Sequence, residues 1–466
     1  MARGISLALA CAFVAAALLF ARPVATPGPL LRDFEAYWSA GVAWNAGENP
    51  YGRAVWDGQR QVPGVDASRD EVLPFVGPPA TLPFWSLLAR LPYSAAARVW
   101  WGLLALSLVA LLALLVRGAR TSVTPVAVFT LLVLALGFGP MTSDLALGQI
   151  ALAALLGATA CVAFGFQPVV ASVGAFVAYL QPNVALGLLS QLGRNRVTLA
   201  LAAGGAAAYL AGAAGVGWFW PVAYAHALLA HAGAERLTAI QFSAASIAFG
   251  FGASEEVARI FGIVVACAAV IGAVAVARRL RDPFARFAAV AALVPLAAGF
   301  FHEHDLIVAF PAAAWSALRA RGAARAVALA GTLLVGIDWL GLAQRPSGIA
   351  QSALLALAAL CAFYALGDET EILPAAVISA ALIPVFGCAA WIAATHPVPV
   401  WPDALGAFHA PVAATIAQTW HAEQQASGLL ARAPASALLR LLSILGCPLL
   451  AAGILRQCRS TSADGG

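Results

Sequence analysis

Polar residues that could carry out chemistry gather near the amino end of the chain, shortly after a first apolar run. Residues 31–38 read LRDFEAYW and combine carboxylates with aromatic side chains. A carboxylate held just outside a membrane helix can take the proton from a hydroxyl group at the bilayer surface, and partial burial raises its pKa toward the working pH. Asp33 is therefore a candidate general base. The alternative is that Asp33 only caps a helix beginning near Phe34, as aspartate commonly does.

A second polar cluster, FHEHD at residues 301–305, lies at the end of a later apolar run. His302 and His304 with Asp305 are plausible metal ligands, but their close spacing suits a strand better than the end of a helix, so we expect no metal. His304, in preference to His302, could instead donate a hydrogen bond or a positive charge to a phosphate group. An ordinary polar loop with internally paired charges is the third interpretation.

The elements that position these residues are membrane helices. Apolar residues make up 62% of the 466 residues, charged residues only 10%, and the mean hydropathy is +0.87. A soluble domain carries about 25% charged residues. The sequence therefore predicts an all-α polytopic membrane protein with about 12–13 transmembrane segments, each near the roughly 20 residues that a spanning helix needs. The thirteen apolar segments lie at residues 4–21, 99–116, 123–139, 145–164, 169–191, 197–217, 258–277, 284–301, 305–318, 326–342, 349–367, 372–394 and 438–455.

Arginines at tight connections set the orientation, because short loops rich in positive charge stay in the cytoplasm. On this rule the long loops at residues 22–98, 218–257 and 395–437 lie on the outer side, together with all seven histidines. Arg440, near the outer end of the last segment, is expected to extend to that surface. Chemistry is expected on the outer face, where the titratable groups are concentrated.

The number of crossings predicts one irregular segment. Three apolar segments lie between the cytoplasmic Arg120 and Arg194, although an even number is required. One of them is therefore expected to be a half-helix or re-entrant segment, which is tolerated at membrane depth only beside protein or a cavity. A misplaced segment boundary is the alternative explanation. The residues that break or polarise this stretch are Gly139-Pro140, Gly148-Gln149 and Gln181-Pro182-Asn183.

The composition also excludes several kinds of site. All 26 basic residues are arginine, which excludes a lysine nucleophile, a Schiff base or a P-loop lysine. No basic run indicates a nucleic-acid partner. The seven cysteines show neither a disulfide framework nor a paired metal spacing. Membrane lipids are thus the expected surroundings, and no nucleic acid is expected.

The order of the polar motifs resembles glycosyltransferase family 87, whose members are membrane mannosyltransferases of the GT-C type that use polyprenyl-phosphate-mannose. The resemblance extends from about Asp33 to about Phe310. Its elements, in chain order, are Asp33-Phe34-x-x-Tyr37, Gly47-x-Asn49-Pro50-Tyr51, Pro78-Pro79, Gly148-Gln149 and His304-Asp305.

The resemblance implies an inverting, metal-independent transfer with Asp33 as the general base. The implied donor is a polyprenyl-phosphate-linked sugar, and no cofactor is implied. We expect the acceptor to be a hydroxyl group of a lipid or glycan. The residues expected to contact the donor phosphate or the substrates are His304, His302, Tyr37, Asn49, Tyr51, Gln149, Gln181 and Asp144, the last as an acceptor-positioning group.

Two departures from the family pattern bear on the donor. The family usually has a lysine where this chain has Gln181, before the proline of the fifth apolar segment. A lysine there would help to neutralise the donor phosphate, so this chain needs another cation. The aromatic residue often found before the Pro-Pro pair is missing, with Val76 and Gly77 in its place.

These features predict a GT-C-like membrane glycosyltransferase with one transmembrane domain over residues 1–456 and a short cytoplasmic tail at 457–466. The expected location is the bacterial inner membrane, with the active site facing the periplasm or the exterior. The alternative is a non-catalytic transporter or flippase of lipid-linked sugars. A transporter should place ionisable residues near the bilayer midplane, whereas here they lie in loops or at helix ends. Asp33 discriminates between the two, because a transporter should tolerate asparagine there.

Overall fold

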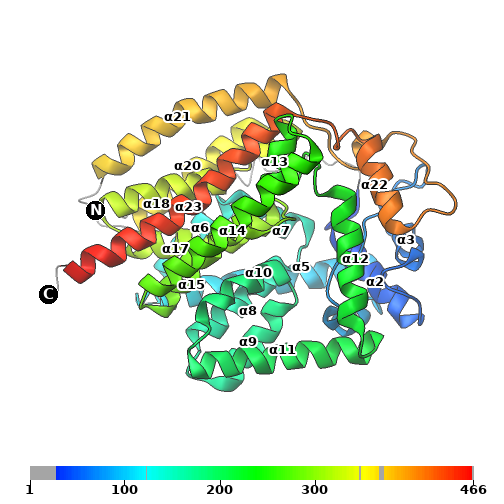
Figure 1. Cartoon of the computed structure of the whole chain (residues 1–466), viewed down its shortest axis with the longest axis horizontal. Helices are drawn as coiled ribbons and strands as arrows, with labels where there is room; N and C mark the ends of the chain where they lie inside the picture. The colour runs from blue at the N-terminus through cyan, green and yellow to red at the C-terminus, as the bar shows by residue number, and fades with distance from the viewer. Residues whose placement is uncertain (1–27, 122, 346–347, 367–371, 464–466) are drawn as a thin grey trace.

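The computed structural model describes residues 28–121, 123–345, 348–366 and 372–463 (Figure 1). Within these ranges the chain forms α-helices, short 3-10 helices and loops, without any strand. The all-helical architecture predicted from the sequence is confirmed. The predicted apolar segment at residues 4–21 lies outside the described ranges.

The helices fall into two halves of the chain. The first half holds α2 (Phe34–Asn45), α3 (Arg53–Gln59), η1 (Pro79–Thr81), α4 (Leu82–Leu88), α5 (Tyr93–Gly118), α6 (Pro125–Leu136), α7 (Gly139–Leu147), α8 (Ala151–Ala163), α9 (Pro168–Tyr179), α10 (Pro182–Ala185), η2 (Leu186–Gln191) and α11 (Asn195–Val216). The second half holds α12 (Trp220–Glu235), α13 (Ala244–Gly250), α14 (Glu255–Arg279), α15 (Pro283–Ala291), α16 (Val294–Ala297), η3 (His304–Ala309), α17 (Phe310–Arg319), α18 (Gly322–Gly336), α19 (Trp339–Gln344), α20 (Ile349–Ala365), α21 (Ile372–Thr395), η6 (Asp403–Leu405), α22 (Ile416–Ala426) and α23 (Pro434–Ala463).

Six helices of the described part are long and apolar enough to cross a membrane, and the bent pair of α6 and α7 would make a seventh. Shorter apolar helices, α8, α9 and α20, have 10–17 residues. By helix length, therefore, six or seven of the predicted segments in the described part are full spans, and the other described segments form shorter or broken helices. The six long spans are α5, α11, α14, Gly322–Gln344 (α18 with α19), Ala376–Thr395 of α21 and Pro434–Arg459 of α23.

Proline explains why several predicted segments are shorter than a span. The predicted segment 169–191 forms α9, α10 and η2, with Pro182 as the first residue of α10. The segment 284–301 falls within α15 and α16, and Pro295 lies in the first turn of α16. A proline lacks the backbone N–H and clashes with the preceding turn, so a continuous helix ends there. Broken helices are tolerated at membrane depth where they lie against protein, and α15 is almost wholly buried.

The irregular segment predicted within residues 120–194 is the pair of α6 and α7. The two helices meet at 81° across a break at residues 137–138. Pro140 follows in the first turn of α7 and prevents α6 from continuing. A Cβ atom built on Gly137 would lie 2.6 Å from the backbone oxygen of Leu355, so α20 packs directly against the break. This bent pair confirms the predicted half-helix or re-entrant segment.

Helices from the three predicted outer loops lie together. The helices α2, α3, α12 and α22 gather at one end of the molecule, and the carboxyl end of α23 lies at the other (Figure 1). α2 contacts α3, and α12 contacts α22. This arrangement is the one expected if the loops share one side of the membrane.

Arg440 in α23 differs from the sequence-based expectation. It does not extend to the membrane surface, because its side chain is only 1% exposed. Its Nη1 group donates hydrogen bonds to the backbone oxygens of Thr238 and Gln241 and to Ser246 Oγ. A buried guanidinium needs several acceptors to offset its lost hydration, and these carbonyl groups supply them. Arg440 thereby fixes the backbone of the second outer loop, which leads to the candidate site.

Glycines allow α8 and α9 to pack closely. A Cβ atom built on Gly174 would lie 2.6 Å from the backbone oxygen of Gly157 and 2.8 Å from the backbone nitrogen of Cys161. Close approach through small residues is typical of helices in membranes, where apolar burial alone gives little drive to associate. The crossing therefore fixes the place of α8, whose amino end follows the loop at Gln149.

Replacing Gly174 by alanine is expected to lower the unfolding temperature of the purified protein. The new methyl group would overlap with backbone atoms, and overpacking costs about 1–3 kcal/mol. Higher helix propensity offsets about 1 kcal/mol of this cost. Gly272→Ala in α14 is the matched control, because no neighbouring atom of the described chain lies within 4 Å of its new Cβ. Thermal unfolding in detergent compares the two, and equal unfolding temperatures would show that the α8–α9 crossing adjusts without cost.

Candidate active site

Asp33 occupies the N-cap position of α2, but its side chain makes no capping hydrogen bond. Its carboxylate Oδ2 instead accepts a hydrogen bond from Gln149 Nε2 at 2.5 Å. The backbone N–H of Asp33 donates to the carbonyl oxygen of Leu147 at 3.0 Å. The side chain is therefore directed toward the turn between α7 and α8, and the capping interpretation does not account for it.

The turn at Gly148 brings the two segments together. Gly148 ends α7 with a φ of +76°, a left-handed conformation that favours glycine. A Cβ atom there would lie 2.8 Å from the Cβ atom of Leu31, so no larger residue fits against the first outer loop. Trp100 Nε1 donates to the carbonyl oxygen of Gly148 at 2.7 Å and holds the turn from α5. With the turn in this place, Gln149 is within reach of Asp33.

Gln149 links the candidate base to Tyr37. Its side-chain oxygen accepts a hydrogen bond from the Tyr37 hydroxyl group, and its side-chain nitrogen donates to Asp33. The Tyr37 ring stacks on Trp85 with ring centroids 4.8 Å apart and planes at 6°. Because both ends of the Gln149 amide are bonded, its orientation is fixed and its N–H group must point at the carboxylate. The structure thus brings together three residues predicted from the sequence.

The surroundings of Asp33 adjust its acidity. The residue is half-buried, and burial raises the pKa of its carboxyl group above the ordinary value. The charge of His304, the hydrogen bond from Gln149 and the charges of His302 and Arg32 oppose this shift in part. A carboxylate whose pKa is raised yet remains oriented is suited to accept a proton near neutral pH.

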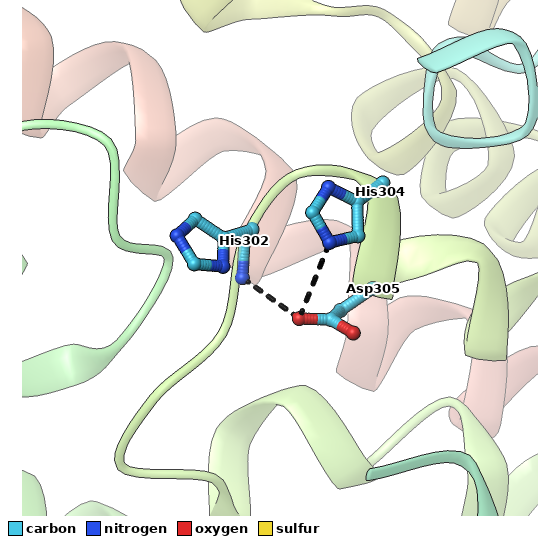
Figure 2. A group of neighbouring side chains, drawn as sticks. All are labelled: His302, His304 and Asp305. Atoms are coloured by element: carbon cyan, nitrogen blue, oxygen red, sulfur yellow. Dashed lines mark hydrogen bonds and ion pairs between the residues drawn. The ribbon is translucent and has the colours of Figure 1, made fainter. Parts of the chain in front are cut away.

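The second polar cluster is formed by His302, His304 and Asp305, where the chain enters η3 (Figure 2). The backbone N–H of His302 donates to Asp305 Oδ2 at 3.1 Å, and His304 Nε2 lies 4.0 Å from the same oxygen. The two imidazole rings have their centroids 5.3 Å apart and their planes at 18°. The charges of both histidines lower the pKa of Asp33, so the cluster and the candidate base lie near each other.

Gln181 joins this cluster from the break between α9 and α10. Its Nε2 group donates to Asp305 Oδ1 at 3.0 Å. Gln181, where the resemblance implies a lysine, therefore faces the aspartate of this cluster.

His302, His304 and Asp305 could also hold a metal ion, since each offers one ligand atom and these atoms lie within 4.8 Å of one another. However, both oxygens of Asp305 already accept hydrogen bonds. One imidazole nitrogen of His302 is likewise bonded, because its Nε2 atom lies 2.6 Å from Glu235 Oε1. Hydrogen bonds therefore satisfy the Asp305 carboxylate and one nitrogen of His302. The other imidazole nitrogens remain as N–H groups that could donate to an anion.

Glu235 is a site residue that sequence reasoning did not identify. It is the last residue of α12 and only 1% exposed. Besides the contact with His302, its carboxylate accepts hydrogen bonds from Gln241 Nε2 at 2.5 Å and from Trp420 Nε1. A lone acid at the end of an otherwise apolar helix, WPVAYAHALLAHAGAE, was the available signal.

The last outer loop closes one side of the site. Trp420 in α22 reaches Glu235, and its ring lies 5.2 Å from that of Trp401. The guanidinium group of Arg32, next to the candidate base, lies 5.0 Å from the centre of the Trp401 ring. Trp401 Nε1 in turn donates to the buried Glu423 at 2.9 Å. The aromatic wall of the site is therefore supplied by residues 395–437.

Asn49 and Tyr51 have bonds within the first outer loop instead. The exposed Asn49 accepts a hydrogen bond from the backbone N–H of Tyr51 at 3.0 Å and so forms a turn. The Tyr51 hydroxyl group donates to the carbonyl oxygen of Gly77 at 2.7 Å, just before the Pro-Pro pair. The structure gives these two residues a role in shaping the loop.

Asp144 is fully buried near the carboxyl end of α7. Its Oδ1 accepts a hydrogen bond from the backbone N–H of Leu152 at 3.2 Å, in the first turn of α8. Its backbone oxygen accepts from the N–H groups of Gly148 and Gln149. Oδ2 has no hydrogen-bond partner within the described chain. Asp144 therefore shapes the turn that carries Gln149.

Comparison with known proteins gives one match. Residues 75–301 match the model of Glycosyltransferase family 87. The matched range contains Gln149, Gln181 and Glu235, whereas Asp33 and His304 lie outside it. No curated protein and no solved structure matches the chain. This stretch, just under half of the chain, is therefore similar to glycosyltransferase family 87.

Proposed function

We propose that the protein transfers a hexose, with mannose as the first candidate, from a polyprenyl-phosphate donor to a hydroxyl group of a lipid or glycan acceptor. The reaction takes place on the non-cytoplasmic face, which in a bacterium is the periplasmic or outer side of the inner membrane. One observation carries the proposal: Asp33 is half-buried, oriented by Gln149, and faces the same region as the His302–His304 pair. The family match supports the transferase class.

In the proposed reaction the acceptor hydroxyl meets Asp33. Gln149 bonds Oδ2 of Asp33, which leaves Oδ1 to take the hydroxyl proton. The acceptor oxygen then forms its bond to the anomeric carbon, and the bond from that carbon to the phosphate oxygen breaks. Attack opposite the leaving group inverts the configuration at that carbon. The electron pair of the broken bond leaves with the polyprenyl phosphate.

The departing phosphate needs positive charge or N–H donors in the transition state. His302 and His304 supply a pair of imidazole groups near the base, and Gln181 contributes a neutral amide. Charge-assisted hydrogen bonds to phosphate are about twice as strong as neutral ones. We therefore assign the donor phosphate to the imidazole pair. This scheme calls for no cofactor.

Asp33→Asn is expected to lower sugar transfer by at least about 10²-fold, the usual contribution of a general base. Asp57→Asn is the matched control, because Asp57 lies in the same outer loop with its side chain 58% exposed. The measurement uses protein reconstituted in lipid, radiolabelled polyprenyl-phosphate-mannose as donor, and octyl mannoside or a bacterial lipid extract as acceptor. A thermal unfolding curve checks that each variant is folded.

The outcomes separate the parts of the proposal. Equal transfer by the native protein and Asp33→Asn would eliminate Asp33 as the base. Loss in both variants would show that the outer loop tolerates no change of charge. The absence of transfer by the native protein with every acceptor would reject this donor and favour a transporter or flippase.

The pH dependence of transfer should report Asp33 directly. A base must be deprotonated, so the rate falls as pH drops through the pKa of Asp33, which burial raises above the ordinary value of about 3.9. Gln149→Leu removes a hydrogen bond that lowers this pKa, so its acid limb should move to still higher pH. Gln61→Leu, at an exposed glutamine of the same loop, should leave the profile unchanged. An identical acid limb for native protein and Gln149→Leu would contradict the assignment.

A further inference from the structure

Glu235 collects hydrogen bonds from three separate parts of the chain. His302 approaches from the segment before η3, Gln241 from the second outer loop and Trp420 from α22. His231, one turn earlier in α12, lies 3.6 Å from the second carboxylate oxygen. A fully buried carboxylate with this many donors is held as an anion, because each donor offsets part of its lost hydration. Its place and its negative charge are therefore both fixed.

The groups around His302 come from every element packed against it. Glu235 and His231 face it from α12, Gln241 from the second outer loop, His304 and Asp305 from η3, and Asp33 from the start of α2. These neighbours include three carboxyl groups and two imidazoles. Negative charge thus predominates around the ring and favours its protonated form.

Positive charge from other residues is limited at this place. The sequence contains no lysine, and Arg32 already donates to Glu71 at 3.0 Å. Gln181, which bonds Asp305, carries no charge. A phosphate group that enters the site therefore needs an imidazolium ion.

We propose that Glu235 is a positioning residue that keeps His302 as an imidazolium ion, and that this ion binds the phosphate group of a prenyl-phosphate ligand. The inference rests on the proposed function and identifies the cation that replaces the charge missing at Gln181. His302 contacts the phosphate, whereas Glu235 acts only through His302. The neutral His304 and Gln181 contribute N–H donors.

The acid–base properties of the pair agree with this arrangement. Burial would lower the pKa of His302, but the charge and hydrogen bond of Glu235, with Asp305 and Asp33, raise it above the ordinary value. Burial would raise the pKa of Glu235, but His302, His231 and the hydrogen bonds from His302 and Trp420 lower it to about 2. For His304, burial outweighs Asp305 and lowers the pKa. His302 therefore keeps its proton to higher pH than His304 does.

Glu235→Gln tests the proposal, because it removes the charge and keeps the shape. The His302 ring is followed by NMR of protein labelled with ¹⁵N-histidine, with His302→Gln identifying its signals. Binding of farnesyl phosphate, a short prenyl monophosphate, is measured by calorimetry across pH. Glu48→Gln, an exposed glutamate of the first outer loop, is the matched control.

In Glu235→Gln the pKa of His302 should fall by at least one unit, and farnesyl phosphate should bind about tenfold more weakly above pH 7, the factor that one pKa unit represents. The alkaline limb of transfer should move to lower pH. Adding Gln181→Lys should restore binding and remove its dependence on pH, because the new ammonium group replaces the imidazolium ion beside Asp305. Glu48→Gln should behave as the native protein does.

An unchanged His302 titration in Glu235→Gln, or unchanged farnesyl phosphate binding, would overturn the proposal. If Glu235→Gln does not fold, farnesyl phosphate binding is compared between His302→Gln and the double variant His302→Gln with Gln181→Lys. Failure of the lysine to restore binding would reject His302 as the cation. Neither titration nor binding requires catalysis. Native protein that binds farnesyl phosphate through His302 but transfers no sugar would therefore reject the proposed function and keep this inference.

Discussion

The contact between the Gly148 turn and the first outer loop is the constraint on which the candidate site depends. Without a side chain at Gly148, the turn lies against Leu31, and the backbone of Leu147 accepts a hydrogen bond from Asp33. The same contact places Gln149 within reach of the carboxylate. Segments more than 100 residues apart in sequence are thus joined through backbone atoms. Since backbone geometry varies less than side-chain geometry, the base has a fixed orientation before any ligand binds.

The broken span makes this contact possible. A continuous helix through residues 125–147 would carry its carboxyl end straight onward, whereas the 81° bend turns α7 across its neighbours. In lipid, a bend of this kind requires other partners for the freed backbone groups. The turn after α7 meets the same requirement, because the backbone oxygen of Asp144 accepts from Gly148 and Gln149 and the Gly148 carbonyl group accepts from Trp100. The polar turn can therefore lie among apolar helices.

The sequence predicts part of this arrangement and not the rest, for physical reasons. The break within residues 120–194 follows from arginine placement and from Pro140, both of which act locally. Asp33 and Gln149 could be named from the order of motifs. Glu235 could not, because its partner Trp420 is 185 residues away and comes close only through the packing of α12 against α22. A single acidic residue in an apolar helix does not show which charged or polar groups will contact it.

The prediction that Arg440 extends to the membrane surface is wrong for a related reason. Hydropathy places a charge at a helix end, but it does not show that carbonyl groups from the second outer loop lie over that end. Asn49 and Tyr51 are named as substrate contacts from motif order and stay a prediction, while their hydrogen bonds in the structure shape the loop. Motif order predicts which segments meet.

The bond from Trp420 to Glu235 has a consequence for biosynthesis. Residue 420 leaves the ribosome long after α12 does, because a chain is made and inserted in order from its amino end. Until α22 arrives, Glu235 lacks one of its donors and the aromatic wall beside Arg32 is absent. In the partly synthesised chain the site is therefore incomplete. The site is therefore complete only after the last outer loop has been synthesised and has folded.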